Sequence, residues 1–282
     1  MSRIAYVAGQ YLPHRQAAVH VEDRGYQFAD GVYEVIAVTG GRLIDEAPHL
    51  ARLHRSLSEL RIPLPMPDAA LRLVLREVIR RNGVDNGIVY LQITRGAAPR
   101  DHAFPKAVMP VLVVTARRSR PPNPRLGQDG IVVITIPDIR WLRCDIKSVS
   151  LVPNVLGKQQ AREAGAYEAW QVDREGQVTE GTSTNAWIVT HDGEVVTRAP
   201  DSAILNGVTR RAVLEIVHRE GYRFAERPFS VAEAKAAREA FLTSTTAELL
   251  PIVRIDGEPV ADGKPGPLSR KLREGYLAHV GA

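Results

Sequence analysis

The segment Asp138-Ile-Arg-Trp-Leu-Arg-Cys-Asp-Ile-Lys-Ser148 interleaves apolar and polar residues in the manner of an irregular strand or a strand end. Counted by twos, Lys147 shares a face with Trp141, and it lies beside the apolar residues Ile146 and Val149. An amine in such surroundings loses hydration, which favours the neutral form that acts as a nucleophile or base. The alternative is a surface lysine whose stem covers Trp141. Period and spacing by themselves favour that alternative.

Length and composition limit the class of protein to which the chain can belong. The chain has 282 residues, of which 44% are hydrophobic and 24% charged, as in a soluble globular protein long enough for two cores. No apolar run approaches the ~20 residues that a membrane span needs, and the first ten residues lack the apolar core of a signal peptide. Cys144 is the single cysteine, which excludes an intrachain disulfide and a multi-cysteine metal site. We expect a cytoplasmic protein without a metal site.

The net charge of +5 leaves several partners possible. Basic residues are scattered among acidic ones, and the densest basic cluster (Arg117, Arg118 and Arg120) has no interleaved aromatic residue on which a base could stack. This cluster is typical of a solvated linker. An enzyme for small anionic substrates fits the charge as well as a nucleic-acid-binding protein does, and we expect neither nucleic acid nor a membrane as a partner.

Strands and helices are mixed without a steady βαβ rhythm, which predicts an α+β fold. The proline-rich stretch up to Gly130 breaks both periodicities and predicts a linker. We therefore expect a smaller N-terminal α/β domain at 1–118, an interdomain linker at 119–130 and a larger C-terminal domain at 131–282 that carries Lys147.

Hydrophobic periodicity also places the individual elements. Strands are predicted as a hairpin at 4–12 and at 32–38, 88–94, 108–115, 131–136, 169–172, 186–189, 241–243 and 252–255. Helices are predicted at 48–62 and 153–164, near Pro267, and after the expected caps Asp68, Asn206 and Ser230.

The segment that contains Lys147 resembles the stretch that carries the cofactor lysine in D-amino-acid transaminases, which are class IV (fold type IV) pyridoxal-phosphate aminotransferases. Five further blocks match family motifs in the family's order, at 23–34, 95–105, 178–185, 205–210 and 243–248. The resemblance covers essentially the whole chain. It implies the two-domain architecture of fold type IV, pyridoxal 5'-phosphate as cofactor and a homodimer with shared active sites.

The resemblance assigns the central chemistry to two residues. Lys147 would bond to the cofactor aldehyde and, once the substrate amine has displaced it, carry a proton between the substrate Cα and the cofactor. Glu180, in Val-Thr-Glu-Gly-Thr, stands where the family's glutamate faces the pyridine nitrogen. Without the resemblance, Glu180 would be interpreted as a solvated acid in a turn.

A phosphate cradle is predicted where Asn206-Gly-Val-Thr209 opens a helix, because the free N–H groups and the helix dipole suit a dianion. Arg52 matches the family's phosphate arginine in a His-Leu-x-Arg-Leu sequence. Taken singly, each of these residues could be a cap, a surface charge or a strand residue. The residues assigned to the phosphate are Arg52, Val208, Thr209, Ser244 and Thr245.

Arg100 and His102 alternate on a predicted loop, where a guanidinium and an imidazole can face one carboxylate. Two solvated loop residues are the alternative. D-amino-acid transaminases clamp the substrate α-carboxylate with an Arg-x-His pair from the neighbouring subunit and with the tyrosine of Gly-Val-Tyr-Glu, which is Tyr33 here. The resemblance implies D-amino acids and 2-oxo acids as substrates, as in D-alanine plus 2-oxoglutarate giving pyruvate and D-glutamate.

Other functions remain possible at this point. Relatives of the same fold act on branched-chain L-amino acids, on (R)-amines or, as lyases, on aminodeoxychorismate. The branched-chain enzymes and the lyases lack the Arg-x-His signature. Gly181-Thr-Ser-Thr184 departs from a more serine-rich family version, which affects only fine cofactor contacts. A more distant alternative is a non-catalytic basic binding module.

Overall fold

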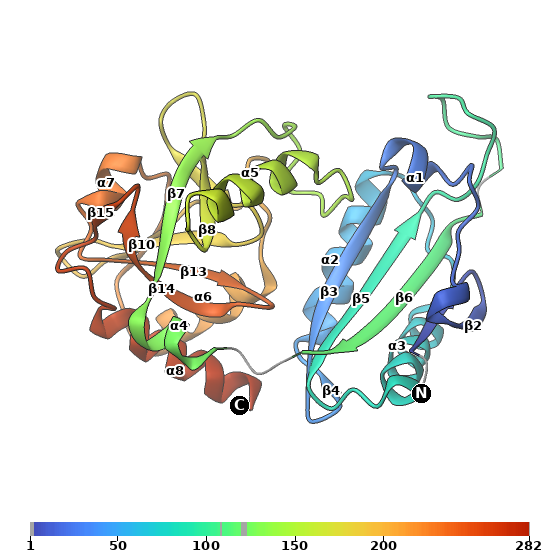
Figure 1. Cartoon of the computed structure of the whole chain (residues 1–282), viewed down its shortest axis with the longest axis horizontal. Helices are drawn as coiled ribbons and strands as arrows, with labels where there is room; N and C mark the ends of the chain where they lie inside the picture. The colour runs from blue at the N-terminus through green and yellow to red at the C-terminus, as the bar shows by residue number, and fades with distance from the viewer. Residues whose placement is uncertain (1–2, 108, 120–122, 282) are drawn as a thin grey trace. The chain divides into compact units, whose positions relative to one another are not determined.

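The computed structural model describes residues 3–107, 109–119 and 123–281, and these form two compact units (Figure 1). Unit 1 consists of Met1–Arg120 with Ile146–Ser150, and unit 2 of Pro121–Asp145 with Leu151–Ala282. Each unit contains its own sheet and its own helices, so the α+β prediction is confirmed. Within the described ranges, no helix combines the length and apolar character needed to span a membrane.

The described part of unit 1 is built on a six-stranded antiparallel sheet with the order β2-β1-β6-β5-β3-β4. Its strands are β1 (Ile4–Val7), β2 (Gln10–Pro13), β3 (Gly31–Thr39), β4 (Arg42–Leu43), β5 (Gly87–Thr94) and β6 (Val111–Arg118). The helices are the 3-10 turn η1 (His14–Gln16), α1 (Arg24–Phe28), α2 (Glu46–Glu59) and α3 (Asp68–Asn82). The strand expected at 108–115 therefore begins later, and residue 108 lies outside the described residues.

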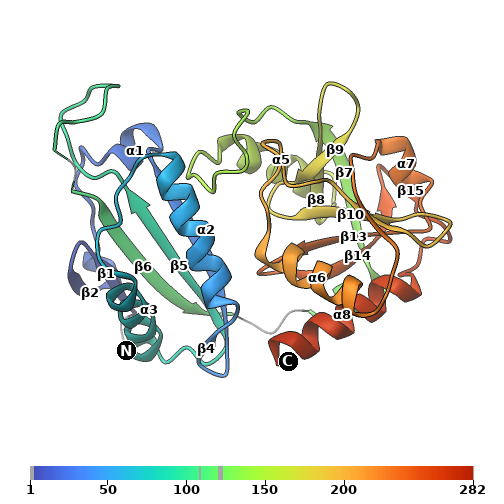
Figure 2. The same ribbon diagram turned by 180° about the vertical axis from the view of Figure 1, so that it is seen from behind.

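One face of this sheet is covered by α2 and α3, as Figure 2 shows. Along β3, Val32, Glu34, Ile36 and Val38 are buried, whereas the alternate residues from Tyr33 to Thr39 are half-buried. This alternation is what the period of two along a strand requires when only one face meets the core. Glu34 is thus a charged residue on the core face.

The described part of unit 2 is built on a nine-stranded mixed sheet with the order β12-β11-β10-β13-β14-β7-β8-β9, and β15 pairs with β14. Its strands are β7 (Ile131–Pro137), β8 (Glu168–Val172), β9 (Val178–Gly181), β10 (Asn185–Val189), β11 (Val195–Thr197), β12 (Phe224–Glu226), β13 (Glu239–Ser244), β14 (Glu248–Ile255) and β15 (Glu258–Pro259). The helices are α4 (Pro124–Asp129), α5 (Val152–Glu163), α6 (Val208–Arg219), α7 (Val231–Lys235) and α8 (Pro267–Val280).

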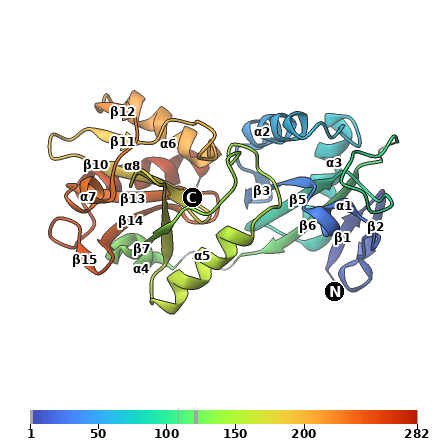
Figure 3. The same cartoon turned by 90° about the horizontal axis from the view of Figure 1, so that it is seen from above.

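Helices cover both faces of the unit 2 sheet. Figure 3 shows α5 and α6 on opposite sides of the strands, where α5 packs on β8 and α6 packs on β13. Every residue of β10 is buried as a result. A strand with two covered faces forms a continuous apolar run, which is how Ala186 to Val189 reads in the sequence.

Two of the three cap predictions are wrong. Asp68 is the first residue of α3, its cap is Pro67, and the Asp68 carboxylate binds His54 Nε2 at 2.8 Å instead. α6 is capped by Gly207, so Asn206 lies one residue before the cap. Ser230 is confirmed as the cap of α7, because its Oγ accepts a hydrogen bond from the Glu233 N–H at 3.0 Å.

The segment expected to be a linker contains a helix. Pro124–Asp129 forms α4, Asn123 caps it through a hydrogen bond from the Arg125 N–H to Asn123 Oδ1 (3.1 Å), and α4 packs on β14. Proline suits the first turn of a helix, where its missing N–H would have no partner. The boundary between the units falls at 120/121, and residues 120–122 lie outside the described residues.

The segment around Lys147 also differs from the prediction. Residues 138–147, all of them described, form neither a helix nor a strand, and Ile146–Ser150 belongs to unit 1 rather than to the C-terminal domain. The Tyr33 N–H donates to the Lys147 carbonyl (3.0 Å), and the Lys147 N–H donates to Ser56 Oγ (3.2 Å). These bonds to β3 and α2 hold the segment in unit 1.

A buried carboxylate caps the start of α8. Glu239 on β13 is 3% exposed and accepts hydrogen bonds from the N–H groups of Leu268 (3.0 Å) and Ser269 (2.8 Å). We predict that Glu239→Ala lowers the free energy of unfolding, measured by urea titration, by about 2 kcal/mol, because two buried N–H groups lose their charged acceptor. The control is Glu258→Ala, which removes an exposed ion pair with Lys235 and should cost less than about 0.5 kcal/mol. Equal losses would contradict the capping role.

Candidate functional site

Lys147 lies beside β3 in unit 1, with its main chain fixed by Tyr33 and Ser56. Its Nζ is 4.3 Å from the centroid of the Tyr33 ring, and that ring stacks on Tyr90 at 5.7 Å. The electron-rich face of an aromatic ring attracts an ammonium group. The aromatic neighbour of the Lys147 amine in unit 1 is therefore Tyr33. Trp141, the neighbour expected from the period of two, belongs to unit 2 and is 43% exposed.

Arg52 is held by a buried carboxylate on the other face of β3. Its Nε and Nη2 donate to the two carboxylate oxygens of Glu34, each at 2.8 Å, and His49 Nδ1 lies 2.8 Å from Glu34 Oε2. Such a two-point contact fixes the plane of the guanidinium. From the sequence, Arg52 is assigned to the phosphate and Glu34 is given no role, although a charged residue at a core position of a strand was the signal for it.

The contacts among Glu34, His49 and Arg52 determine which of these side chains are charged. Burial of Glu34 opposes its charged form, but the charge and hydrogen bonds of Arg52, with the hydrogen bond from His49, outweigh it and lower the pKa of Glu34 to about 2. Burial lowers the pKa of His49, against the opposing effect of Glu34. Glu34 is thus ionised and His49 neutral near pH 7, with His49 Nδ1–H donating to Glu34.

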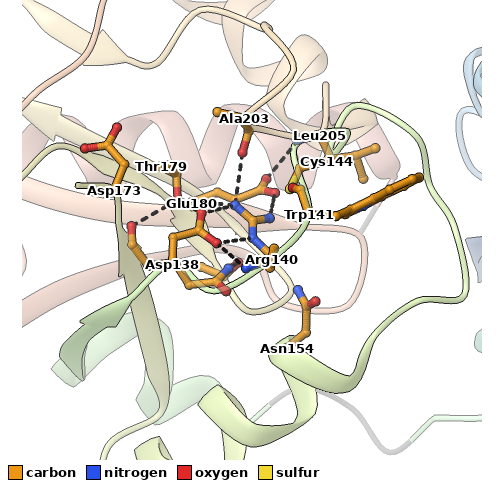
Figure 4. Close-up of polar contacts among 12 residues, drawn as sticks. Asp138, Arg140, Trp141, Cys144, Asn154, Asp173, Thr179, Glu180, Ala203 and Leu205 are labelled. Atoms are coloured by element: carbon orange, nitrogen blue, oxygen red, sulfur yellow. Dashed lines mark hydrogen bonds and ion pairs between the residues drawn. The ribbon is translucent and has the colours of Figure 1, made fainter. Parts of the chain in front are cut away.

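Glu180, at the end of β9, belongs to a polar network in unit 2 (Figure 4). Its Oε1 accepts a short hydrogen bond from Arg140 Nη1, and its Oε2 accepts from Asn185 Nδ2 (3.0 Å) and from the Leu205 N–H (3.1 Å). The residue is 6% exposed. A buried carboxylate with these donors is an oriented negative group and not the solvated turn acid of the alternative interpretation.

Arg140 fixes the charge of this network. Its guanidinium donates to Asp138 (2.7 Å from Nη2), to Thr179 Oγ1 (3.2 Å) and to the Ala203 carbonyl (3.0 Å), in addition to Glu180. Burial opposes its charge, but the charge of Glu180 and the hydrogen bond of Asp138 outweigh it and raise the pKa of Arg140. Burial likewise opposes the charge of Asp138, but the contacts with Arg140 lower the pKa of that carboxyl group. Arg140 therefore remains a cation.

Asp138 and Arg140 belong to the segment that resembles the cofactor-lysine stretch, but the sequence indicated no role for them. The signal was the Asp-x-Arg spacing, which lets the aspartate accept both the Arg140 N–H and its Nε, each at 3.0 Å. Asn185 was part of the block 178–185 and was also left without a role. Its amide links two motifs, because Nδ2 donates both to Glu180 and to the Leu205 carbonyl (2.8 Å).

The start of α6 lies next to this network. Gly207, the cap residue of α6, has no side chain that could accept from the first N–H groups of the helix, and such a helix start suits an anion. A β-carbon at Gly207 would clash with Asn185 Oδ1, so the close approach requires glycine. Thr209 Oγ1 lies 3.4 Å from Tyr276 Oη on α8.

Ser244 and Thr245 lie where β13 turns into β14. Thr243, the preceding residue, is the Cα partner of Asn185 in the sheet. The turn after β13 therefore lies at the same end of the sheet as Asn185, the first residue of β10. The Ser244 hydroxyl accepts a hydrogen bond from the Ala247 N–H (3.0 Å) and keeps its own proton for a further acceptor. Unit 2 thus gathers Glu180, the α6 start and these hydroxyls.

Arg100 and His102 lie on an exposed loop of unit 1 after β5. Both side chains pack on Phe28 of α1, with Arg100 Cζ 4.5 Å from the ring centroid and the His102 ring 5.3 Å from it. The structure therefore brings the Arg-x-His pair together. Tyr33 makes its ring contacts elsewhere, with Lys147 and Tyr90.

Comparison with known proteins identifies the family. The family described as "Amino-transferase class IV" matches residues 31–255. The chain is 42% identical to the D-alanine aminotransferase of Staphylococcus haemolyticus over 98% of this chain and 97% of that one, and 42% identical to that of Bacillus licheniformis over 94% and 93%. It superposes with a TM-score of 0.87 and 25% identity on the branched-chain aminotransferase of Thermoproteus uzoniensis solved with norvaline, covering 100% and 96% of the two chains. The chain belongs to the class IV aminotransferases.

Enzymes of this family use pyridoxal 5'-phosphate, and the residues of this chain fit that cofactor. The start of α6, whose cap residue is a glycine, suits a phosphate group, and the lack of space for a β-carbon at Gly207 is what a close backbone cradle requires. Glu180 offers a buried carboxylate for a protonated ring nitrogen, and Lys147 offers an amine for the aldehyde.

The lowered pKa of Glu34 predicts an acid-sensitive stability. A carboxylate whose pKa falls from 4.5 to about 2 on folding stabilises the folded state above pH 4.5, and the effect is lost as the pH falls toward 2. We predict that, between pH 5 and pH 2, the free energy of unfolding falls by on the order of 3 kcal/mol more in the wild type than in Glu34→Gln. Urea titration measures it.

Glu77→Gln provides the control for that experiment, because Glu77 pairs with Arg80 and Arg81 on the surface of α3. Water screens such a pair, so the free energy of unfolding of Glu77→Gln should depend on pH in nearly the same way as that of the wild type. Parallel pH profiles for wild type and Glu34→Gln would contradict the role of Glu34.

Proposed function

We propose that this enzyme transfers the amino group of D-alanine, or a similar D-amino acid, to 2-oxoglutarate, giving pyruvate and D-glutamate. The observation that supports the proposal is that Arg100 and His102 pack on the same ring, that of Phe28, an arrangement that suits the binding of a single carboxylate. The sequence relatives support it, because relatives named D-alanine aminotransferase are 38–42% identical to this chain, whereas solved branched-chain enzymes are 22–27% identical.

The bound cofactor supplies a covalent attachment for the amino group and an electron sink for the bond broken at Cα. Lys147 is assigned to hold the cofactor and then to move the proton at the substrate Cα. The contact of its Nζ with Tyr33 supports a defined position for the amine. Glu180 is assigned to keep the ring nitrogen protonated, which its orientation by Arg140 and Asn185 supports.

The phosphate is assigned to the α6 start and to an arginine. The backbone N–H groups of Val208 and Thr209 would bind it, and the hydroxyls of Ser244 and Thr245 would add donors. Arg52 would supply charge, with its plane set by Glu34. Arg100, His102 and Tyr33 are assigned to the substrate α-carboxylate.

The proposal includes a homodimer, in which a second copy of the chain supplies part of the substrate anchor. An exposed apolar stripe on α5 supports a partner surface. Val152, Val155 and Leu156 are 69%, 63% and 52% exposed at the i, i+3, i+4 spacing of one helix face. We place the enzyme in the cytoplasm, in keeping with its buried free thiol at Cys144.

Turnover with D- and L-alanine tests the substrate proposal. We predict that the purified, cofactor-loaded protein converts D-alanine and 2-oxoglutarate to pyruvate and D-glutamate at least roughly 100-fold faster than L-alanine or L-leucine. The reason is that the L-enantiomer cannot place its carboxylate on the anchor and its Cα proton toward the lysine together. Chiral chromatography of the glutamate formed measures this. Turnover confined to the L-amino acids would reject the proposal.

Borohydride reduction tests the assignment of the lysine. Reduction of the loaded protein should add the mass of one reduced cofactor to the peptide that contains Lys147, and Lys147→Ala should lose this adduct. Lys158→Ala is the control, since Lys158 on α5 donates to the Tyr167 carbonyl and should not affect the adduct. An adduct on any other lysine of the wild type would refute the assignment.

A further inference from the structure

Arg24 connects α1 to the loop that carries Arg100 and His102. Arg24 is 3% exposed, and its Nη1 donates to the Asp101 carbonyl (2.5 Å) while its Nη2 lies 3.4 Å from the His102 carbonyl. These acceptors are main-chain atoms of the loop itself. Arg24 therefore contacts the loop through its backbone, whatever side chains the loop carries.

The charge of Arg24 is balanced within the protein. Its Nε donates to Asp30 Oδ2 (2.8 Å), and Arg95 binds the same carboxylate through Nε (2.7 Å) and Nη2 (3.0 Å). Burial opposes the charge of Asp30, but the hydrogen bonds and charges of Arg95 and Arg24 outweigh it and lower the pKa of Asp30. A buried, paired arginine of this kind holds geometry and is not available to a substrate.

Phe28, one turn further along α1, is the second contact point. Arg24 Cζ lies 4.8 Å from its ring centroid, Arg100 Cζ lies 4.5 Å from it, and the His102 ring lies 5.3 Å from it. The backbone of the loop is thus held by Arg24, and its two functional side chains pack on Phe28. Both contacts come from the same short helix.

The position of α1 is itself fixed at the end of β5. Asp23 Oδ1 accepts from the Gly25 N–H (2.8 Å), Asp23 Oδ2 accepts from Thr94 Oγ1 (2.9 Å), and the Arg24 N–H donates to the Gly96 carbonyl (2.9 Å). A β-carbon at Gly25 would clash with Thr94 Cγ2, so glycine is needed for this approach. These contacts fix the position of α1 against the end of β5.

The loop needs such a support because its residues 99–104 are exposed to solvent. A carboxylate anchor works only if its guanidinium and imidazole stay in one arrangement, since each freely rotating group costs binding free energy when it is ordered. An exposed loop supplies little order of its own. Order must come from contacts with a fixed element, and α1 supplies them.

We propose that Arg24 and Phe28 of α1 form a positioning platform that sets Arg100 and His102 for the α-carboxylate of the substrate. Arg24 is then a positioning residue that determines affinity for amino and oxo acids without contacting them. This inference rests on the proposed function of Arg100 and His102.

Trypsin tests the platform without the cofactor, because Arg100 and Lys106 in the loop are cleavage sites. In cofactor-free protein, Arg24→Lys should raise the initial rate of cleavage at these two sites about 10-fold, followed by mass spectrometry. Lysine keeps the charge for Asp30 but lacks the planar fork that reaches two carbonyls. Val38→Ala, at the opposite end of β3, is the control for a general loss of stability and should not raise cleavage at these sites. Equal cleavage of the Arg24→Lys variant and wild type would overturn the proposal.

Kinetics of the loaded enzyme test the consequence for substrates. Arg24→Lys should raise KM for D-alanine and for 2-oxoglutarate at least about 10-fold, change kcat less than about 3-fold and leave the affinity for pyridoxal 5'-phosphate unchanged. Val38→Ala should leave KM unchanged. A fall in kcat with constant KM, or loss of the cofactor, would overturn the positioning role.

A double-mutant cycle separates this inference from the proposed function. If Arg24 acts through the loop, Arg24→Lys should change KM less than about 2-fold in an Arg100→Ala/His102→Ala background. The full 10-fold effect in that background would overturn the proposal, because Arg24 would then act elsewhere. If Arg100→Ala/His102→Ala by itself leaves KM unchanged, the anchor assigned under the proposed function fails, and the inference about substrates fails with it.

Discussion

The candidate site in unit 1 depends on the main-chain hydrogen bonds between β3 and the segment 146–150. The Tyr33 N–H donates to the Lys147 carbonyl, and the Val149 N–H donates to the Gly31 carbonyl (3.1 Å). The main chain of Lys147 is therefore hydrogen-bonded directly to β3. Since side chains alternate along a strand, β3 then presents Tyr33 toward the Lys147 amine and Glu34 toward Arg52 on the other face. One strand thereby sets the positions of the amine and of an arginine.

Buried carboxylates paired with arginine recur at each part of the candidate site: Glu34 with Arg52, Glu180 with Arg140, and Asp30 with Arg24 and Arg95. Such pairs add little net stability, because removing both charges from water offsets most of their attraction. Their value here is geometric, since a planar guanidinium bound at two points has a fixed orientation. Cofactor and substrate chemistry requires groups held in place before the ligand arrives. We interpret the repeated pairs in this way.

Local patterns in the sequence predicted most of the longer elements, but neither short ones such as α1 and α4 nor the networks that join the elements. The leucines at 50, 53 and 57 repeat every three or four residues, and α2 buries all three. The contact between Arg140 and Glu180 spans 40 residues, and that between Arg24 and Asp101 spans 77, so no local period reports them. The same limit explains the error about Trp141. A period of two assumes a regular strand, whereas the backbone from Asp138 to Lys147 is irregular and leaves one unit for the other.

A crystal structure of the protein loaded with pyridoxal 5'-phosphate tests the central claim most directly. We expect continuous electron density between Lys147 Nζ and the cofactor, with a carboxylate oxygen of Glu180 within hydrogen-bond distance of the pyridine nitrogen. Density joining the cofactor to a different lysine, or a ring nitrogen that faces a group other than Glu180, would contradict it.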